Sequence, residues 1–303
     1  MIIGIDHGYG MVKTVSDLFV TGLASFDKQP PSMEHTLFYG GKYYTVGGTR
    51  QPVQSKTENI NYYIMTLAAV AKELKRRKAN TKQKIMIGAG LPLTYFESER
   101  KGFKNYLEKE KGQIIHYQYE STWYDIEIQK AVIFPQGYSA ILPYYSDLKG
   151  TSYIIDIGSN TIDIVMLDNM TPNMQKLVTI PMAGVISAYK RVNDEIAKAF
   201  NTNLQESQIR SVILDEEDGL PDRAKELAKA ALKKYAGYIV ASLKEYGINP
   251  ELSRCFFVGG GAVIIKKYSE ISDYSNVAFI TDICANARGY ELMLKAKETK
   301  EGK

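Results

Sequence analysis

Two short segments of this chain share one plan of residue types. Ile5–Gly10 and Ile155–Asn160 each contain the end of an apolar strand, an Asp, a Gly two residues later and a tight polar turn, and an apolar return strand follows. Such a turn points several backbone N–H groups into one concavity, which suits phosphate oxygens. The Gly allows the backbone to take a positive φ and to come close to the ligand.

A single turn of this kind is more often an ordinary β-turn, because Asp and Gly are common turn residues. Here two matched copies occur, and each opens one half of the chain. The repeat therefore predicts two similar domains whose turns bind one polyphosphate from both sides.

The carboxylates of the two turns, Asp6 and Asp156, would lie near these phosphates. Carboxylates and phosphates come close only with a cation between them, and Mg²⁺ that keeps most of its water ligands suits this place. Lys13 follows on the first return strand, where its ammonium would reach a phosphate as a point charge.

Two further motifs have competing readings. Gly259–Gly261 follows an apolar strand and precedes a helix. Three glycines at such a place can form a flat surface on which a purine or ribose lies, or they can allow the strand and the helix to cross closely, and the motif alone favours both equally. Gln136 follows Pro135 at a strand end, where a side-chain amide can orient an attacking water. Taken alone, Gln136 is more simply the first residue of a helix.

The elements that would position these residues alternate between strands and helices. We expect Val12–Val20 to continue as one strand-like segment, residues 26–58 to form an irregular insertion with a hairpin at Leu37–Val46, and 136–144 to form a short helix. The charged tail 298–303 is predicted to be solvated and not helical. Further predicted strands are 84–88, 152–156, 162–167, 254–258 and 277–280, and further predicted helices are 59–79, 97–109, 184–200, 204–214, 221–246 and 283–297.

Composition limits the class of protein. The chain has 303 residues, of which 45% are hydrophobic and 24% charged, as in ordinary globular proteins. No apolar run would span a membrane, the two cysteines form no CxxC pair, and the N-terminus does not resemble a secretory signal, so a cytoplasmic protein is expected. There is no GxxxxGK[ST] motif, and Lys13 replaces the third glycine of a GxGxxG motif.

Five segments together resemble the actin-like ATPases. They correspond in order to a first phosphate loop, a first connecting helix, a second phosphate loop, an adenosine loop and a second connecting helix. Among these proteins the chain is most similar to the ParM/StbA plasmid-segregation group, through Gly4–Lys13, Gly90–Thr94 and Ala285–Tyr290. The five segments are Asp6–Lys13, Phe134–Leu142, Asp156–Asp163, Val258–Ala262 and Ala285–Leu292.

The resemblance implies an α/β, actin-like (ribonuclease-H-like) two-domain fold with ATP or ADP and Mg²⁺ in a cleft between the domains. Domain I would span 1–147 and domain II 148–282, with a C-terminal helix and charged tail over 283–303 that return toward domain I. Asp6 and Asp156 would organise Mg²⁺, and Gln136 would position the attacking water, where ParM carries a Glu. The residues expected to contact the nucleotide are Gly8, Tyr9, Gly10, Lys13, Gly158, Ser159, Asn160, Thr161, Gly184, Gly259, Gly260 and Gly261.

The resemblance also implies an ATP hydrolase that polymerises into filaments, which move plasmid DNA through a separate centromere-binding adaptor protein. The alternative is a non-polymerising phosphohydrolase, because Ile155–Thr161 is also similar to the phosphate loop of exopolyphosphatases. No membrane partner is expected. Direct DNA binding through Lys75–Lys78 is a minor hypothesis, since cations in the last turn of a helix complement its dipole.

Overall fold

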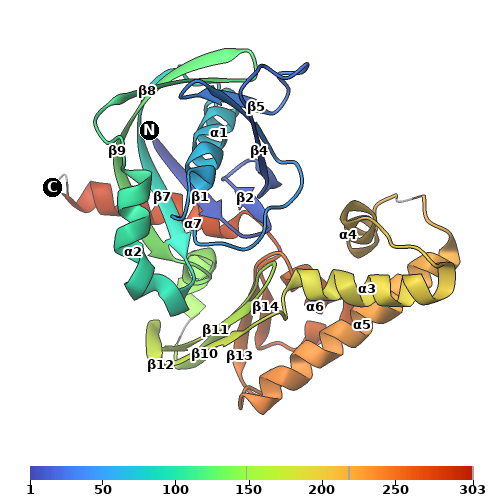
Figure 1. Cartoon of the computed structure of the whole chain (residues 1–303). Coiled ribbons are helices and arrows are strands. Elements are labelled where there is room, and N and C mark those ends of the chain that lie inside the picture. The colour runs from blue at the N-terminus through green and yellow to red at the C-terminus, as the bar shows by residue number, and fades with distance from the viewer. Residues whose placement is uncertain (148, 218, 302–303) are drawn as a thin grey trace. The chain divides into compact units, whose positions relative to one another are not determined.

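The computed structural model describes residues 1–147, 149–217 and 219–301. The chain divides into two compact units (Figure 1). Unit 1 contains Met1–Leu142 and Ile283–Lys303, and unit 2 contains Pro143–Asp282. The boundary predicted from the sequence at residue 148 and the last two residues of the predicted tail lie outside the described residues.

Unit 1 is built on a nine-stranded mixed sheet with the order β3-β2-β1-β7-β9-β8-β5-β6-β4. Its centre is parallel, because β1 pairs with β7 and β7 with β9 in the same direction, and the remaining pairs are antiparallel. The strands are β1 (Ile2–His7), β2 (Met11–Lys13), β3 (Leu18–Val20), β4 (Leu23–Phe26), β5 (Thr36–Tyr39), β6 (Lys42–Val46), β7 (Lys82–Leu91), β8 (Ile114–Tyr119) and β9 (Thr122–Pro135).

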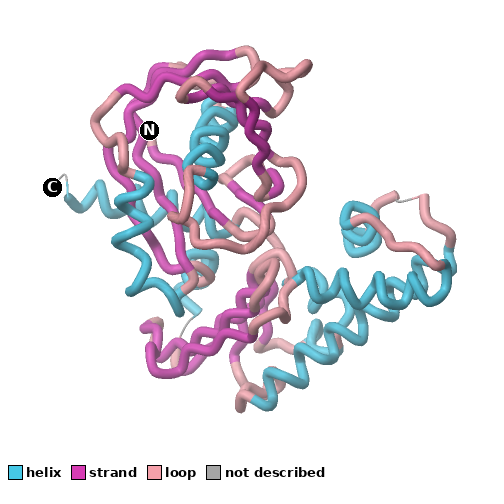
Figure 2. Tube along the Cα trace, viewed as in Figure 1, coloured by secondary structure: helices cyan, strands magenta, loops and turns pink. Residues whose placement is uncertain are grey.

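The sheet of unit 1 curves around helix α1 (Asn61–Arg76) (Figure 2). Almost every residue of α1 is buried, and its apolar side chains form the centre of the core of this unit. The other helical elements here are α2 (Leu93–Leu107), the 3₁₀ helix η1 (Tyr138–Asp147), which runs into the start of unit 2, and α7 (Ala285–Glu301).

Helix α7 contacts β1 and β7 at positions where these strands carry glycine. A Cβ on Gly4 would lie 2.0 Å from the carbonyl oxygen of Ala287, and one on Gly90 would lie 2.0 Å from the hydroxyl oxygen of Tyr290. A larger residue at Gly4 would therefore displace the backbone of the helix, and one at Gly90 would displace the ring of Tyr290. The C-terminal segment is thus an integral part of unit 1.

Three expectations about local structure are wrong. Residues 12–20 form two strands, because Thr14 and Asp17 close a turn with a backbone hydrogen bond of 2.8 Å. The helix expected over 136–144 is a 3₁₀ helix that begins at Tyr138. The tail expected to be non-helical continues α7 to Glu301, and Lys130 Nζ bonds both Glu298 and Glu301 at 2.8 Å.

Unit 2 has a five-stranded sheet with the order β12-β11-β10-β13-β14. Its strands are β10 (Thr151–Ile157), β11 (Ile162–Asp168), β12 (Thr171–Ile180), β13 (Arg254–Val258) and β14 (Val277–Phe279). The long helices α3 (Val185–Phe200) and α5 (Asp222–Glu245) lie side by side (Figure 1). The shorter helices are α4 (Glu206–Leu214), α6 (Ala262–Tyr268) and the 3₁₀ helix η2 (Glu270–Asp273). Apolar side chains of α3 and α5 pack with those of β10 and β13 and form the core of this unit.

Candidate functional site

The first turn of the repeat is organised around the buried carboxylate of Asp6. Asp6 lies near the end of β1 and is 0% exposed. Lys13 Nζ donates to Asp6 Oδ2 at 3.0 Å, and Gln136 Nε2 donates to Asp6 Oδ1 at 2.8 Å. Burying a carboxylate is costly unless it is paired and hydrogen-bonded, so these two donors make its position tenable. The structure thus brings together three of the residues singled out in the sequence.

Gln136 is held in place from three sides. Its backbone N–H donates to the carbonyl oxygen of Leu91 at the end of β7, at 2.8 Å. The next residue, Gly137, donates its N–H to Asn286 Oδ1 of α7 at 2.9 Å. The residues that follow β9 are therefore hydrogen-bonded to both β7 and α7, and the Gln136 side chain is directed to Asp6.

The backbone of the first turn, which includes Gly8, Tyr9 and Gly10, is fixed by Thr21. Thr21 Oγ1 donates to the carbonyl oxygen of Gly8 at 2.7 Å, and the Thr21 N–H donates to the carbonyl oxygen of Gly10 at 3.0 Å. Two carbonyl groups of the turn are therefore directed to Thr21. Nothing in the sequence singled out this threonine.

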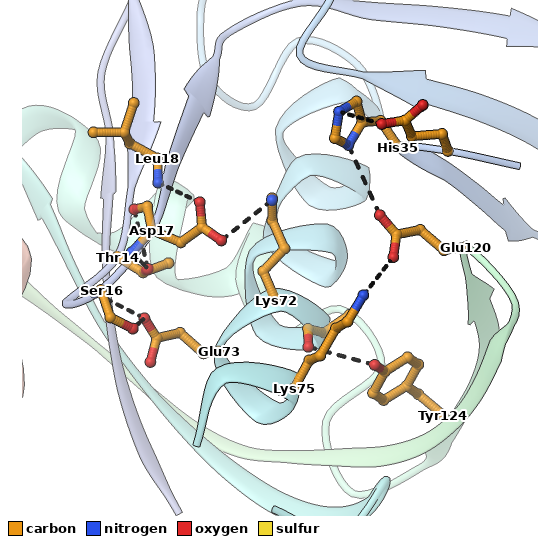
Figure 3. Close-up of polar contacts among 12 residues, drawn as sticks. Thr14, Ser16, Asp17, Leu18, His35, Lys72, Glu73, Lys75, Glu120 and Tyr124 are labelled. Carbon is orange, nitrogen blue, oxygen red and sulfur yellow. Dashed lines mark hydrogen bonds and ion pairs between the residues drawn. The ribbon is translucent and has the colours of Figure 1, made fainter. Parts of the chain in front are cut away.

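Helix α1 supports the strand that carries Lys13. Figure 3 shows Ser16 directed to Glu73 and Asp17 directed to Lys72, both on α1. Glu73 Oε1 accepts hydrogen bonds from the N–H of Ser16 at 3.0 Å and from its hydroxyl at 2.7 Å, and Lys72 Nζ lies 3.2 Å from Asp17 Oδ2. These contacts hold the β2–β3 turn against the helix and so fix β2.

The second turn, residues 158–161, is closed by a backbone hydrogen bond of 3.0 Å from the N–H of Gly158 to the carbonyl oxygen of Thr161. The start of α3 packs onto it. The N–H groups of Gly184, Val185 and Ile186 donate to the carbonyl oxygens of Asn160, Gly158 and Ser159 at 3.2, 3.0 and 3.0 Å. The carbonyl oxygens of residues 158–160 thus accept hydrogen bonds from backbone N–H groups that have no acceptor within helix α3 itself. Gly184 positions the turn, and its contact with a nucleotide stays a prediction.

Asp156 is the penultimate residue of β10, the strand that leads into the second turn, and it lies beside the glycine segment 259–261. It pairs in register with Asp163 on β11 and with Val258 on β13. Gly259 has φ +84°, and a Cβ there would lie 2.4 Å from Asp156 Oδ1, so a larger side chain would strain the backbone and displace the carboxylate. The structure therefore brings Asp156, the second turn and Gly259, Gly260 and Gly261 together within unit 2.

Asp163 is a polar residue that the sequence argument did not treat as a site residue by itself. Thr161 Oγ1 and Thr179 Oγ1 donate to its two carboxylate oxygens at 3.1 and 2.6 Å. Burial raises the pKa of Asp163 above its ordinary value, and these hydrogen bonds act in the opposite direction. A signal was present, because Ile162-Asp163-Ile164 repeats the residue types of Ile155-Asp156-Ile157 on the neighbouring strand.

His7 packs into the core of unit 1. It is fully buried, its Nε2 lies 2.8 Å from Thr66 Oγ1 of α1, and its ring meets the ring of Phe103 edge-on. Burial lowers the pKa of His7 to about 3, so the imidazole is neutral at physiological pH. The histidine in the first motif is therefore a core residue.

The carboxylates expected to organise Mg²⁺, Asp6 and Asp156, belong to different units. Among residues 1–147, 149–217 and 219–301, no group of three or more His, Cys, Asp or Glu side chains gathers as a metal cage. Each turn supplies a carboxylate, and both oxygens of Asp6 already accept hydrogen bonds. Mg²⁺ is commonly held by one or two carboxylates with waters and substrate phosphates, and its binding at Asp6 and Asp156 stays a prediction.

The cationic run at the end of α1 is engaged in ion pairs. Lys75 Nζ lies 2.8 Å from Glu120, and Arg77 pairs with Glu73 at 2.6 Å and with Glu291 at 2.7 Å. These contacts link the C-terminal end of α1 to the β8–β9 turn and to α7 within unit 1. No helix in the described part of the chain is long and apolar enough to span a bilayer.

Two family models match the chain, one in each half. Residues 4–138 match the N-terminal domain of actin-like proteins, and residues 154–270 match the C-terminal domain of the archaeal MreB-like actin homologue. The chain has the actin-like fold. The actin-like two-domain α/β fold that the resemblance implied is confirmed, and its sheets are mixed.

Solved structures similar to this actin-like chain cover almost its whole length. The archaeal actin homologue Ta0583 in complex with ADP has a TM-score of 0.74 and 19% identity and covers 98% of this chain and 99% of its own. The actin-like protein Alp7A has a TM-score of 0.77 and 16% identity, with 100% and 98% covered. A 15-stranded ParM filament from Clostridium botulinum has a TM-score of 0.72 and 20% identity, with 97% and 99% covered. No curated protein sequence matches the chain.

The contacts of Glu73 predict a pH-dependent contribution to stability. Burial alone would raise the pKa of this carboxyl, but hydrogen bonds from Thr14, Ser16 and Arg77 outweigh burial and hold the pKa below its ordinary value of 4.5. A folded-state pKa below that of the unfolded chain gives a contribution that is present above pH 4.5 and lost as the pH falls below it. Glu73→Gln should therefore lower the unfolding free energy at pH 7 by about 1–3 kcal/mol.

Urea titrations at pH 7 and pH 4 measure this effect. The difference between wild type and Glu73→Gln should shrink at pH 4. Glu97→Gln is the matched control, because Glu97 is exposed and pairs with Arg100 one turn away, so its change should stay within about 0.5 kcal/mol. An equal loss in both variants would contradict the assigned role of Glu73.

Proposed function

We propose that this chain is an actin-like ATPase that polymerises into filaments with ATP and Mg²⁺. The observation that carries the proposal is the buried Asp6 carboxylate, which Lys13 and Gln136 hold beside the first glycine turn. A second turn of the same plan lies beside Asp156 in unit 2. We infer that the two turns bind the phosphates of one nucleotide.

The chemistry of the similar structures supports this proposal. The archaeal actin homologue Ta0583 has a complex with ADP, and ParM from Bacillus thuringiensis has one with AMPPNP. Alp12 and the Clostridium botulinum ParM are filament structures. Nucleotide binding and self-association are thus properties of proteins with this fold, and we propose both for this chain.

The arrangement at Asp6 suggests how Gln136 would act. Its Nε2 is committed to Asp6, so Oε1 is the atom available to accept a hydrogen bond from a water. A water held in this way would be oriented for in-line attack on a terminal phosphate. Lys13 would stabilise phosphate charge, and Asp6 and Asp156 would hold Mg²⁺ through its waters, where the ion neutralises charge on the phosphates.

The hydrolysis step is tested by two substitutions. Asp156→Ala is expected to abolish phosphate release from ATP. Gln136→Ala is expected to slow release by about 10²-fold or more while nucleotide affinity stays within a few-fold, because only the orientation of the water is lost. Released phosphate and binding of a fluorescent ATP analogue are measured on the same preparations. Wild-type rates in either variant would contradict the assignment.

The polymerisation step is tested by light scattering of the purified protein. Scattering should rise when ATP and Mg²⁺ are added and should fall as ATP is hydrolysed, because loss of the γ-phosphate removes contacts that hold the assembled conformation. Electron microscopy of the same samples identifies filaments. A chain that hydrolyses ATP but stays monomeric at high concentration would instead be a phosphohydrolase of the exopolyphosphatase-like kind.

We further propose plasmid segregation as the biological role, with a separate centromere-binding adaptor protein that joins the filament to DNA. The support is the similarity of Gly90–Thr94 and Ala285–Tyr290 to the plasmid-segregation actins. An unstable test plasmid that carries the gene with its flanking DNA should be retained over generations without selection. The Asp156→Ala gene should lose this effect. Equal loss of both plasmids would contradict the role in segregation.

A further inference from the structure

Lys56 is a buried cation that the site described so far does not use. It lies in the connection between β6 and α1 and is 4% exposed. Its ammonium lies 5.6 Å from the ring centroid of Tyr9, in the first turn, and 5.5 Å from that of Phe103 on α2. These are cation–π contacts, which hold a cation but leave its hydrogen-bond donors without acceptors.

The ammonium of Lys56 has no hydrogen bond or ion pair among the described residues. The charged groups that act on it are Asp6, Glu99 and Lys13. Asp6 already accepts hydrogen bonds from Lys13 and Gln136, and Glu99 is exposed on α2. Burial lowers the pKa of Lys56 to about 8, which is the direction expected when a cation loses its water and gains no close carboxylate.

The connection that carries Lys56 is bonded to the first turn through Thr21. The N–H of Gln51 donates to the carbonyl oxygen of Thr21 at 2.9 Å, and Thr21 Oγ1 donates in turn to the carbonyl oxygen of Gly8. Gln54, in the same connection, has a buried side-chain nitrogen that finds no acceptor in the described part of the chain. Buried donors without acceptors are uncommon and indicate a missing partner.

We propose that Lys56 binds a phosphate oxygen of the nucleotide at the first turn and thereby joins the connection 47–60 to the bound nucleotide. A phosphate oxygen would supply an acceptor that no described residue gives to this ammonium. Lys56 is then a second phosphate-binding lysine beside Lys13, contributed by a different part of unit 1. The inference rests on the proposed function, since it requires that the first turn binds a nucleotide.

The test compares Lys56→Met with wild type in titrations of a fluorescent ATP analogue and Mg²⁺. The affinity should fall about 10- to 100-fold, as expected for loss of a hydrogen bond between charged groups. Lys109→Met is the matched control, because the Lys109 ammonium also lies over an aromatic ring, that of Tyr63 at 3.8 Å, but belongs to a different part of the unit. Its affinity should stay within about 2-fold of wild type.

Thermal melting without nucleotide separates binding from a purely structural role. Removal of a buried cation that lacks an anionic partner should leave the melting temperature of Lys56→Met unchanged or raise it. Wild-type affinity in Lys56→Met overturns the inference but leaves the proposed function in place. Failure of the wild-type protein to bind any nucleotide overturns both.

Hydrogen exchange of the wild-type protein tests the inference even if Lys56→Met does not fold. ATP with Mg²⁺ should slow amide exchange in 47–60, because a phosphate bound to Lys56 would restrain that connection. Exchange in the β8–β9 hairpin serves as the internal reference and should not change. Equal rates in 47–60 with and without nucleotide would overturn the inference.

Discussion

Much of the structure of unit 1 follows from the need to satisfy one buried carboxylate. Asp6 is removed from solvent at the end of β1, and a carboxylate in that position is stable only with donors on its oxygens. Lys13 comes from the next strand, and Gln136 comes from the far end of β9. The antiparallel return of β2, the clamp on β9 and the attachment of α7 through Asn286 all serve to place these two donors.

The two turns share a plan but are supported by different means. In unit 1 the side chain of Thr21 and two donors on Asp6 hold the turn. In unit 2 the first amides of α3 bind the carbonyl oxygens of the turn, and Asp156 lies against Gly259, where no side chain intervenes. The internal repeat therefore preserves the backbone plan of the turn, while the surrounding packing differs because the elements around each turn differ.

One connection of unit 1, between β6 and α1, is joined to the first turn through the hydrogen bonds of Thr21. The connection between β6 and α1 has no regular secondary structure, yet its backbone bonds to Thr21 and it carries a buried lysine. Functional residues are often found on such loops, because a rigid scaffold positions them. The pairing of β4 with β6 explains the proximity, because Leu23 lies opposite Val46 and so places Thr21, just before β4, beside the start of this connection.

The sequence by itself determined the two glycine turns, the amphipathic helices such as 184–200 and 221–246, and, through the order of the motifs, the fold class. These features depend on local backbone preferences and on the periodicity of apolar residues, and both are visible in residues that lie close together in the sequence. Only the tertiary structure decided that Gln136 bonds Asp6, 130 residues away, that Lys56 lies over Tyr9, and that Lys130 bonds Glu298 and Glu301 of the charged tail. Such partners depend on the order of strands in the sheet and on the path of α7, and no local pattern of residues contains that information.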